Sequence, residues 1–162
     1  MGKPQNNAQG EMQLLAEWIA TLPHGWKSKT HVNVGAQLLE YAGARLTPAQ
    51  SRAFGVWNDW ADARVWTGPS VWIVEAKLVA TGAAYGQVLD YAAEYPDSAD
   101  YEQFAPAWIL PVVLTTAARP RTAGFFQGKG VNTVIFQPSF PLSQALAKLF
   151  PAAQILQPAS AP

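Results

Sequence analysis

Two acidic residues and a lysine, Asp62, Glu75 and Lys77, occur on two apolar runs that a short turn sequence separates. If the two runs form a symmetric hairpin, Asp62 stands directly opposite Glu75, and Lys77 shares a face with Glu75. Like charges that face each other destabilise a sheet. A bound divalent cation would offset this cost, because carboxylate oxygens are the ligands that Mg²⁺ prefers. The three residues therefore indicate a metal site at one end of a hairpin.

The hairpin itself is predicted from residue types. The runs 61–66 and 71–77 are rich in β-branched and aromatic residues, and the turn signal Thr67-Gly68-Pro69-Ser70 lies between them. Two alternatives remain open. The acids could lie at a solvated sheet end where Lys77 neutralises Glu75, or a bulge at Gly68 could shift the register by one residue and separate them.

Length and composition limit the class of protein. A chain of 162 residues with 49% hydrophobic and 14% charged residues predicts one domain with a proper core. No apolar run has membrane-spanning length and no leader sequence is evident, so we expect a soluble intracellular protein without a membrane partner. The absence of Cys excludes thiolate chemistry, and two His are too few for a His-rich zinc site. The net charge of zero argues against a protein that coats long nucleic acids, but it leaves room for a local basic patch.

The hydrophobic periodicity of the chain and the positions of its Gly, Pro and helix-capping residues predict an α/β domain. Its expected core is a central mixed sheet of about four to five strands flanked by helices on both faces. We expect a flexible arm at 1–10, the domain at 11–150 and a flexible Pro/Ala-rich tail at 151–162. The expected helices are 11–22, 36–44, a brief one from 47 to about 54, 81–95 and 142–150; the strands are 29–34, 61–66, 71–77, 108–115 and 131–136; the loops are 96–106 and 117–130.

This element order resembles the PD-(D/E)XK nuclease superfamily, whose members share a restriction-endonuclease-like core. The resemblance is carried by Asp62, by Glu75-x-Lys77 at the end of a strand, and by Gln87-x-x-x-Tyr91 on the next helix. It covers residues 30–140 and is strongest to small, phage-type, single-domain members with a RecB-like Gln-x-x-x-Tyr helix. The Glu-x-Lys tripeptide alone is weak, and its spacing from the other motifs adds specificity. Ala61 stands where the family pattern has Pro.

The resemblance implies a DNA nuclease that uses Mg²⁺ or Mn²⁺. The metal would be held by Asp62, Glu75 and the carbonyl of Ala76, and it would activate a water and neutralise charge on the phosphate. Lys77 would orient the attacking water and stabilise the transition state. Gln87 and Tyr91, which lie one helical turn apart, would support this site from the following helix.

Each supporting residue also has a structural interpretation. Tyr91 lies near the apolar face of its helix and could belong to the core, and Gln87 could be an ordinary surface residue. Glu40 could supply the additional acid that some relatives carry on an early helix, although a solvated position is the simpler interpretation. Arg64 is expected on the same face as the acids, where it could either contact a phosphate or form an ion pair with Glu75.

A basic loop and several tryptophans complete the candidates. Arg119, Arg121 and Lys129 are spaced along the expected loop 117–130, where they could contact a DNA backbone or simply be solvated. Four tryptophans flank the site in sequence, and we expect them in the core or in partner contacts rather than stacked on bases: Trp57, Trp60, Trp66 and Trp72.

Two functions of different classes follow. The first is a Mg²⁺-dependent DNA nuclease in the cytoplasm of a bacterial host. The second is a phage virion protein, for example at the neck or connector, that keeps the nuclease fold with little or no activity and assembles with itself or with other particle proteins. A metal-free nucleic-acid-binding module is a third, weaker hypothesis. The complete acid, acid and lysine set favours the nuclease.

Overall fold

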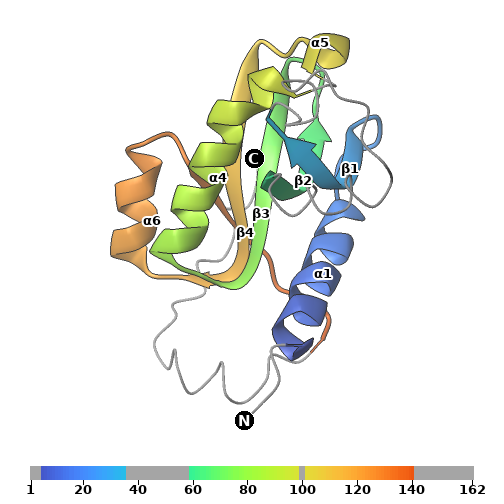
Figure 1. Ribbon diagram of the computed structural model, residues 1–162. Helices are drawn as coiled ribbons and strands as arrows, with labels where there is room; N and C mark the ends of the chain where they lie inside the picture. The colour runs from blue at the N-terminus through green and yellow to red at the C-terminus, as the bar shows by residue number, and fades with distance from the viewer. Residues whose placement is uncertain (1–4, 36–58, 99–100, 141–162) are drawn as a thin grey trace, which may run out of the picture.

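The computed structural model describes residues 5–35, 59–98 and 101–140 (Figure 1). Three predicted helices (36–44, 47–54 and 142–150), Glu40, Trp57 and the tail 151–162 lie outside these ranges. The elements in chain order are α1 (Gln5–Ile19), β1 (Lys27–Val34), β2 (Asp59–Trp66), β3 (Ser70–Ala80), α4 (Gly82–Glu94), the 3-10 helix η1 (Tyr95–Asp97), α5 (Tyr101–Phe104), β4 (Trp108–Ala118), α6 (Pro120–Gln127) and β5 (Asn132–Ile135).

The described strands form one mixed sheet in the order β1-β2-β3-β4-β5. Strands β1, β2 and β3 are antiparallel neighbours, and β3, β4 and β5 run parallel. A parallel neighbour requires a crossover, and the crossover from β3 to β4 contains α4 while that from β4 to β5 contains α6. The predicted α/β class with a central mixed sheet is confirmed.

The predicted register of the β2–β3 hairpin is also confirmed where the two strands pair. Ala63 pairs with Val74 and Trp66 with Val71, so no bulge shifts the strands. The backbone N–H of Thr67 donates to the carbonyl of Ser70 at 2.9 Å. Gly68 adopts a φ of +104°, which an L side chain rarely takes, and this explains the glycine in the turn.

Helices cover both faces of the sheet (Figure 1). On one face α4 and α6 pack over a core that includes Ile73, Tyr85 and Val113. On the other face α1 packs Leu14 and Trp18 over a second core of strand residues, namely Ala63, Val65, Val74, Ala76, Leu78, Val112 and Leu114. Alternate residues of β3 face the two cores, so its side chains are buried on both sides, as expected for a central strand.

The helix that follows β3 was predicted with its cap. The hydroxyl of Thr81 accepts a hydrogen bond from the N–H of Ala84 at the start of α4, and the helix gives way to η1, which contains Pro96. The apolar run that became β4 includes Pro111. This proline precedes Val112, the first β4 residue paired with β5, so its missing N–H removes no bond from that ladder.

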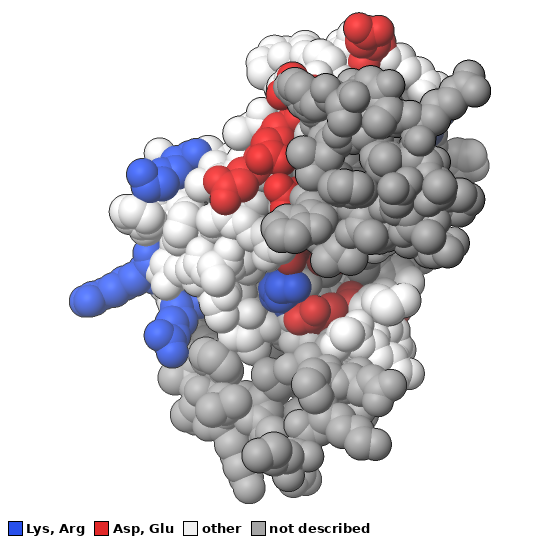
Figure 2. All heavy atoms as spheres, viewed as in Figure 1, with Lys and Arg blue, Asp and Glu red and all other residues white. Residues whose placement is uncertain are grey.

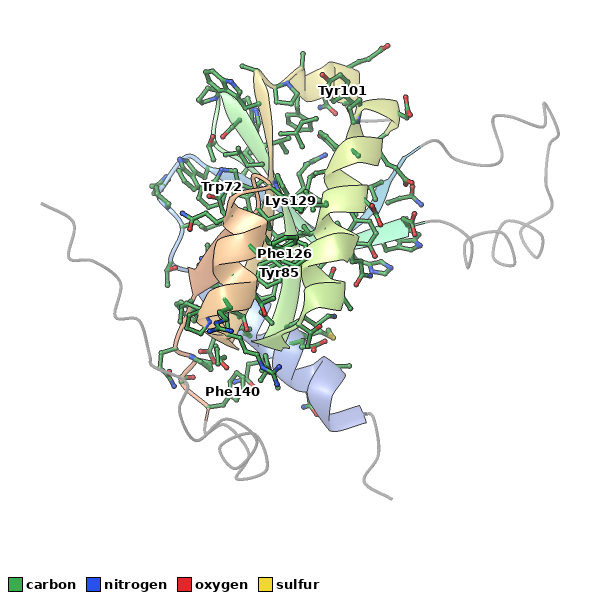
Figure 3. All side chains as sticks on the ribbon, turned by 90° about the vertical axis from the view of Figure 1, so that its left-hand side faces the viewer. Trp72, Tyr85, Tyr101, Phe126, Lys129 and Phe140 are labelled. Atoms are coloured by element: carbon green, nitrogen blue, oxygen red, sulfur yellow. The ribbon has the colours of Figure 1, made fainter. Side chains whose placement is uncertain are left out.

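The largest differences from the sequence prediction lie in three places. Helix α1 begins at Gln5 rather than at Glu11, so residues 5–10 are helical and not part of an arm. The expected loop 96–106 contains part of η1 and all of α5. The expected loop 117–130 contains α6, whose aromatic residue Phe126 stacks on Tyr85 of α4 with ring centroids 4.8 Å apart (Figure 3). The signal for α6 was Pro120 at its first position, which Gly124 and Gly128 obscured.

No helix in the described ranges is both long enough and apolar enough to cross a membrane.

Candidate active site

Asp62 lies at the point where β2 and β3 stop pairing. The last backbone pair of the hairpin is Ala63 with Val74. Beyond it, the Oδ2 atom of Asp62 accepts a hydrogen bond from the backbone N–H of Ala76 at 2.8 Å. A side-chain carboxylate thus takes the position of a backbone acceptor, which fixes Asp62 against β3.

Glu75 is buried next to this carboxylate. Only 2% of its surface is exposed, and its Oε1 atom lies 2.9 Å from the Nζ atom of Lys77. Burial, together with the negative charge of Asp62, raises the pKa of Glu75 to about 7, and the hydrogen bond and charge of Lys77 only partly oppose this shift. Asp62 and Glu75 are therefore close enough to interact electrostatically, as the hairpin register predicted.

A third acid, Glu11 on α1, joins the site and was not expected. Its Oε2 atom lies 3.4 Å from Lys77 Nζ, and the two residues are 66 positions apart in the sequence. Burial raises the pKa of Glu11, against the opposing charge and hydrogen bond of Lys77. Glu11 and Asp62 also line a cavity of about 130 Å³ with Ala8, Met12 and Leu15. No local motif marks Glu11, because its relation to the hairpin depends on how α1 packs.

Lys77 connects the acids. Burial by itself would lower the pKa of its ammonium group, but the hydrogen bond to Glu75 and the charges of Glu75, Glu11 and Asp62 outweigh burial and raise this pKa. The lysine is therefore charged throughout the neutral range. Its side chain is 31% exposed, so the ammonium group can still reach solvent or a ligand.

The residues of the Gln-x-x-x-Tyr pattern lie on α4 and contact each other. The Nε2 atom of the exposed Gln87 donates to the hydroxyl of Tyr91. Tyr91 is 6% exposed and belongs to the core under α4. Burial raises the pKa of its hydroxyl, and the negative charges of Glu75, Asp59 and Asp62 raise it further. Tyr91 is thus both a core residue and a neighbour of the acids, and the hydrogen-bond partner of Gln87 is Tyr91, not Lys77.

The candidate DNA contacts fall into two groups. Arg64 is 7% exposed and its guanidinium lies 4.4 Å from the centre of the Phe104 ring, so it offers little surface to a phosphate, and Glu75 pairs with Lys77 instead. Arg119, Arg121 and Lys129 are exposed at the two ends of α6. Figure 2 shows basic side chains projecting on the side of the molecule where α6 lies, and acidic side chains along the middle of the same face.

The acids retain free ligand atoms. Oδ1 of Asp62 and Oε2 of Glu75 have no hydrogen bond within the described part of the chain. Within the same residues, no group of three or more acidic or histidine side chains has an arrangement that would hold a metal ion by itself. Any cation would therefore be held by the two carboxylates together with backbone or water oxygens.

Comparison of the chain with protein-family models, curated proteins and solved structures found no match.

Proposed function

We propose that this protein is a Mg²⁺- or Mn²⁺-dependent DNA nuclease of the PD-(D/E)XK type. The observation that carries the proposal is the meeting of Asp62, Glu75 and Lys77 at the end of the hairpin, with the two acids in electrostatic contact and the lysine bonded to one of them. Two further features support it. The order helix, three antiparallel strands, helix and parallel strand agrees with the resemblance, and Glu11 adds a third acid from the first helix.

The donor chemistry fits a hard divalent cation. Two carboxylates lie together, and that of Glu75 is almost fully buried. Within the hydrogen-bonded cluster, Lys77 supplies the one positive charge that balances their negative charges. Each carboxylate has an oxygen without a hydrogen bond from the described residues. Mg²⁺ and Mn²⁺ prefer such oxygen ligands. Asp62, Glu75 and the carbonyl of Ala76 would hold the ion, which would lower the pKa of a bound water and offset the charge that builds on the phosphate.

The protein's own groups then have separate tasks. Lys77, charged at neutral pH and partly exposed, would bind a phosphate oxygen or orient the attacking water. Glu11 would keep the ammonium group aimed at the site by its contact with Nζ. Tyr91 and Gln87 would pack beside the acids and limit water around them.

The distribution of charge favours one direction for the substrate. Ala80 of β3 pairs with Ala118 of β4, so Arg119 and Arg121 lie at the end of the sheet to which β3 runs after Lys77. Exposed guanidinium groups there would bind phosphates of a strand that leaves the site toward α6. DNA, rather than a membrane or a small molecule, is therefore the partner that we propose.

The test is cleavage by the purified full chain. Duplex, single-stranded and branched DNA are incubated with Mg²⁺, Mn²⁺ or EDTA, using wild type, Glu75→Gln, Lys77→Met and the exposed control Glu102→Gln. We expect metal-dependent cutting that falls by at least about 1000-fold in the first two variants and is unchanged in the control, because catalytic groups that act together are rarely dispensable. Absence of cutting on all three substrates, or cutting that survives Glu75→Gln, would contradict the proposal.

A second candidate function is favoured by exposed apolar side chains. Met12, Trp108 and Phe125 are 72%, 63% and 61% exposed, and Met and aromatic residues are enriched in protein interfaces relative to the rest of the surface. They suit a phage virion component with this fold that assembles with itself or with neighbouring particle proteins. A defined oligomer by native mass measurement, unchanged by Glu75→Ala and without cleavage, would favour this function; a strict monomer would remove it.

A further inference from the structure

A histidine on β1 lies flat against a tryptophan on β2 beside the candidate active site. The rings of His31 and Trp60 have centroids 4.3 Å apart and planes that differ by 8°. His31 is exposed, whereas Trp60 is partly buried. The pair therefore presents an imidazole face to solvent with a larger ring supporting it from behind.

The backbone at His31 is strained within an otherwise regular strand. Its φ is +51°, a conformation that side-chain-bearing residues adopt rarely and at a cost in free energy. The pairing continues on both sides of it, from Thr30 with Ala63 to Val32 with Ala61, so the strain does not shift the register. A strained exposed residue that the sheet does not need for its pairing is a candidate for a binding role.

The pair is adjacent to the proposed metal ligands. In the β1–β2 register, His31 lies between Thr30, which pairs with Ala63, and Val32, which pairs with Ala61, so it is level with Asp62 along the sheet. Trp60 precedes Asp62 by two residues, which places it about 7 Å along the same strand. A nucleotide whose phosphate reached Asp62 and Glu75 would have its neighbouring base near His31.

The same strand also carries exposed positive charge. Lys27, Lys29 and His31 alternate along β1, and all three are exposed. Alternate residues of a regular strand share a face, so the ammonium groups of Lys27 and Lys29 project from one side of β1 in the stretch that leads to His31. Basic groups that follow a backbone, combined with a ring on which a base can stack, are the features of single-strand binding surfaces.

We propose that the His31–Trp60 pair is a stacking platform for an unpaired nucleobase of the strand bound at Asp62 and Glu75, an inference that rests on the proposed nuclease function. Every base has a flat face, so the platform would bind without sequence preference. In a duplex that face is already covered by stacking. The platform would therefore favour single-stranded regions, frayed ends or branch points over intact duplex.

The test is binding without cleavage, by fluorescence anisotropy of a labelled single-stranded oligonucleotide in EDTA and in Ca²⁺. His31→Asn removes the ring but keeps a residue that tolerates positive φ, and His24→Asn removes an exposed loop histidine as the matched control. We expect the first variant to bind about tenfold more weakly and the second to bind as wild type. Thermal melting by circular dichroism verifies that both variants fold.

Oligonucleotides with a single abasic position, moved along the strand, locate the base. With wild type, one position should weaken binding by about tenfold, and with His31→Asn that position should have no further effect. Equal binding by His31→Asn and wild type, abasic losses that persist in the variant, or no single-strand binding by wild type would each overturn the platform.

The outcome is separable from that of the nuclease proposal. If Glu75→Gln leaves cleavage unchanged or wild type does not cleave, while His31→Asn still weakens single-strand binding, the catalytic assignment fails and the platform stands. If cleavage requires Glu75 and His31→Asn binds normally, the nuclease stands and the platform fails.

Discussion

The two ends of the β2–β3 hairpin are built from the same two strands but held by different interactions. At the turn end, the backbone ladder is regular and Trp72 packs against Trp18 and Trp26, with ring centroids 6.4 and 5.1 Å away. At the opposite end the ladder stops, and Asp62 and Glu75 occupy the opening with Lys77 between Glu75 and Glu11. One end buries apolar surface, and the other places the buried Glu75 beside the partly buried Asp62.

The difference separates stability from chemistry. Apolar and aromatic burial at the turn end lowers the free energy of the folded state. A buried carboxylate beside another one raises it, and Lys77 offsets this cost only in part. The open end is therefore an energetic cost in the metal-free protein, which is what a binding site for a cation would require. Variants at the two ends should consequently affect different measurements.

Trp72→Ala should have the largest effect on stability. It removes a ring that contacts two other tryptophans, and such truncations cost about 3 kcal/mol or more. Denaturant unfolding measures the loss, and cleavage per folded molecule should not change at low temperature. Trp108→Ala, at a ring that is 63% exposed, is the matched control and should cost under about 1 kcal/mol. A similar loss in both variants would contradict the contrast between the two ends.

Glu75 should make the metal-free protein less stable as the pH rises. Its pKa is about 7 when folded and near the ordinary value of 4.5 when unfolded, so the folded state binds the proton more tightly. The resulting stability is complete below about pH 4.5 and is lost as the pH rises through about 7, by up to about 3 kcal/mol. Unfolding of wild type and Glu75→Gln across this range measures the difference.

Above pH 7, Glu75→Gln should therefore be as stable as wild type or more stable in EDTA. Saturating Mg²⁺ should flatten the wild-type profile, because a bound cation favours the ionised carboxylate. Parallel pH profiles for wild type and the variant would show that Glu75 does not carry this charge cost.

Gly68→Ala should have a moderate effect at the turn end. A Cβ at this position meets no atom within 4 Å, so the cost comes from the φ of +104° and amounts to about 1–2 kcal/mol. Gly82→Ala is a suitable comparison, because a Cβ there also meets nothing and the residue lies in the first turn of α4. That variant should be neutral or slightly stabilising, as thermal melting would reveal.

The smallest expected effect is the difference in the free energy of unfolding between Asp62→Asn and Asp62→Ala, about 1 kcal/mol. The amide oxygen of Asn can still accept from the N–H of Ala76, whereas Ala leaves this donor without its partner. Both variants remove the negative charge of Asp62, which acts on Glu75, and should therefore lower the pKa of Glu75. NMR titration of Glu75 measures this change. An unchanged Glu75 pKa in both variants would show that the two acids do not interact, and it would contradict the proposed metal site.

Much of the scaffold was predictable because local rules govern it. Turn chemistry and alternation determine the pairing of Ala63 with Val74, and the Thr81 hydroxyl begins α4 where the sequence indicates a cap. Helix α6 was missed because Gly124 and Gly128 weaken its local signal, and because the packing of Phe126 on Tyr85 is a contact between elements that no local pattern encodes. The role of Arg64 was also undetermined, since its burial beside Phe104 depends on the position of α5.

The sequence by itself determined the β2–β3 hairpin and limited its register to a few choices, one of which places Asp62 opposite Glu75, because a short turn permits few registers. Only the tertiary structure decided that Glu11 joins them, that the carboxylate of Asp62 bonds Ala76, and that Glu75 is buried deeply enough for its pKa to reach about 7. It also brought His31 against Trp60. Pairing within a hairpin is a short-range property of the chain, whereas burial and contacts between distant residues depend on how helices and strands pack.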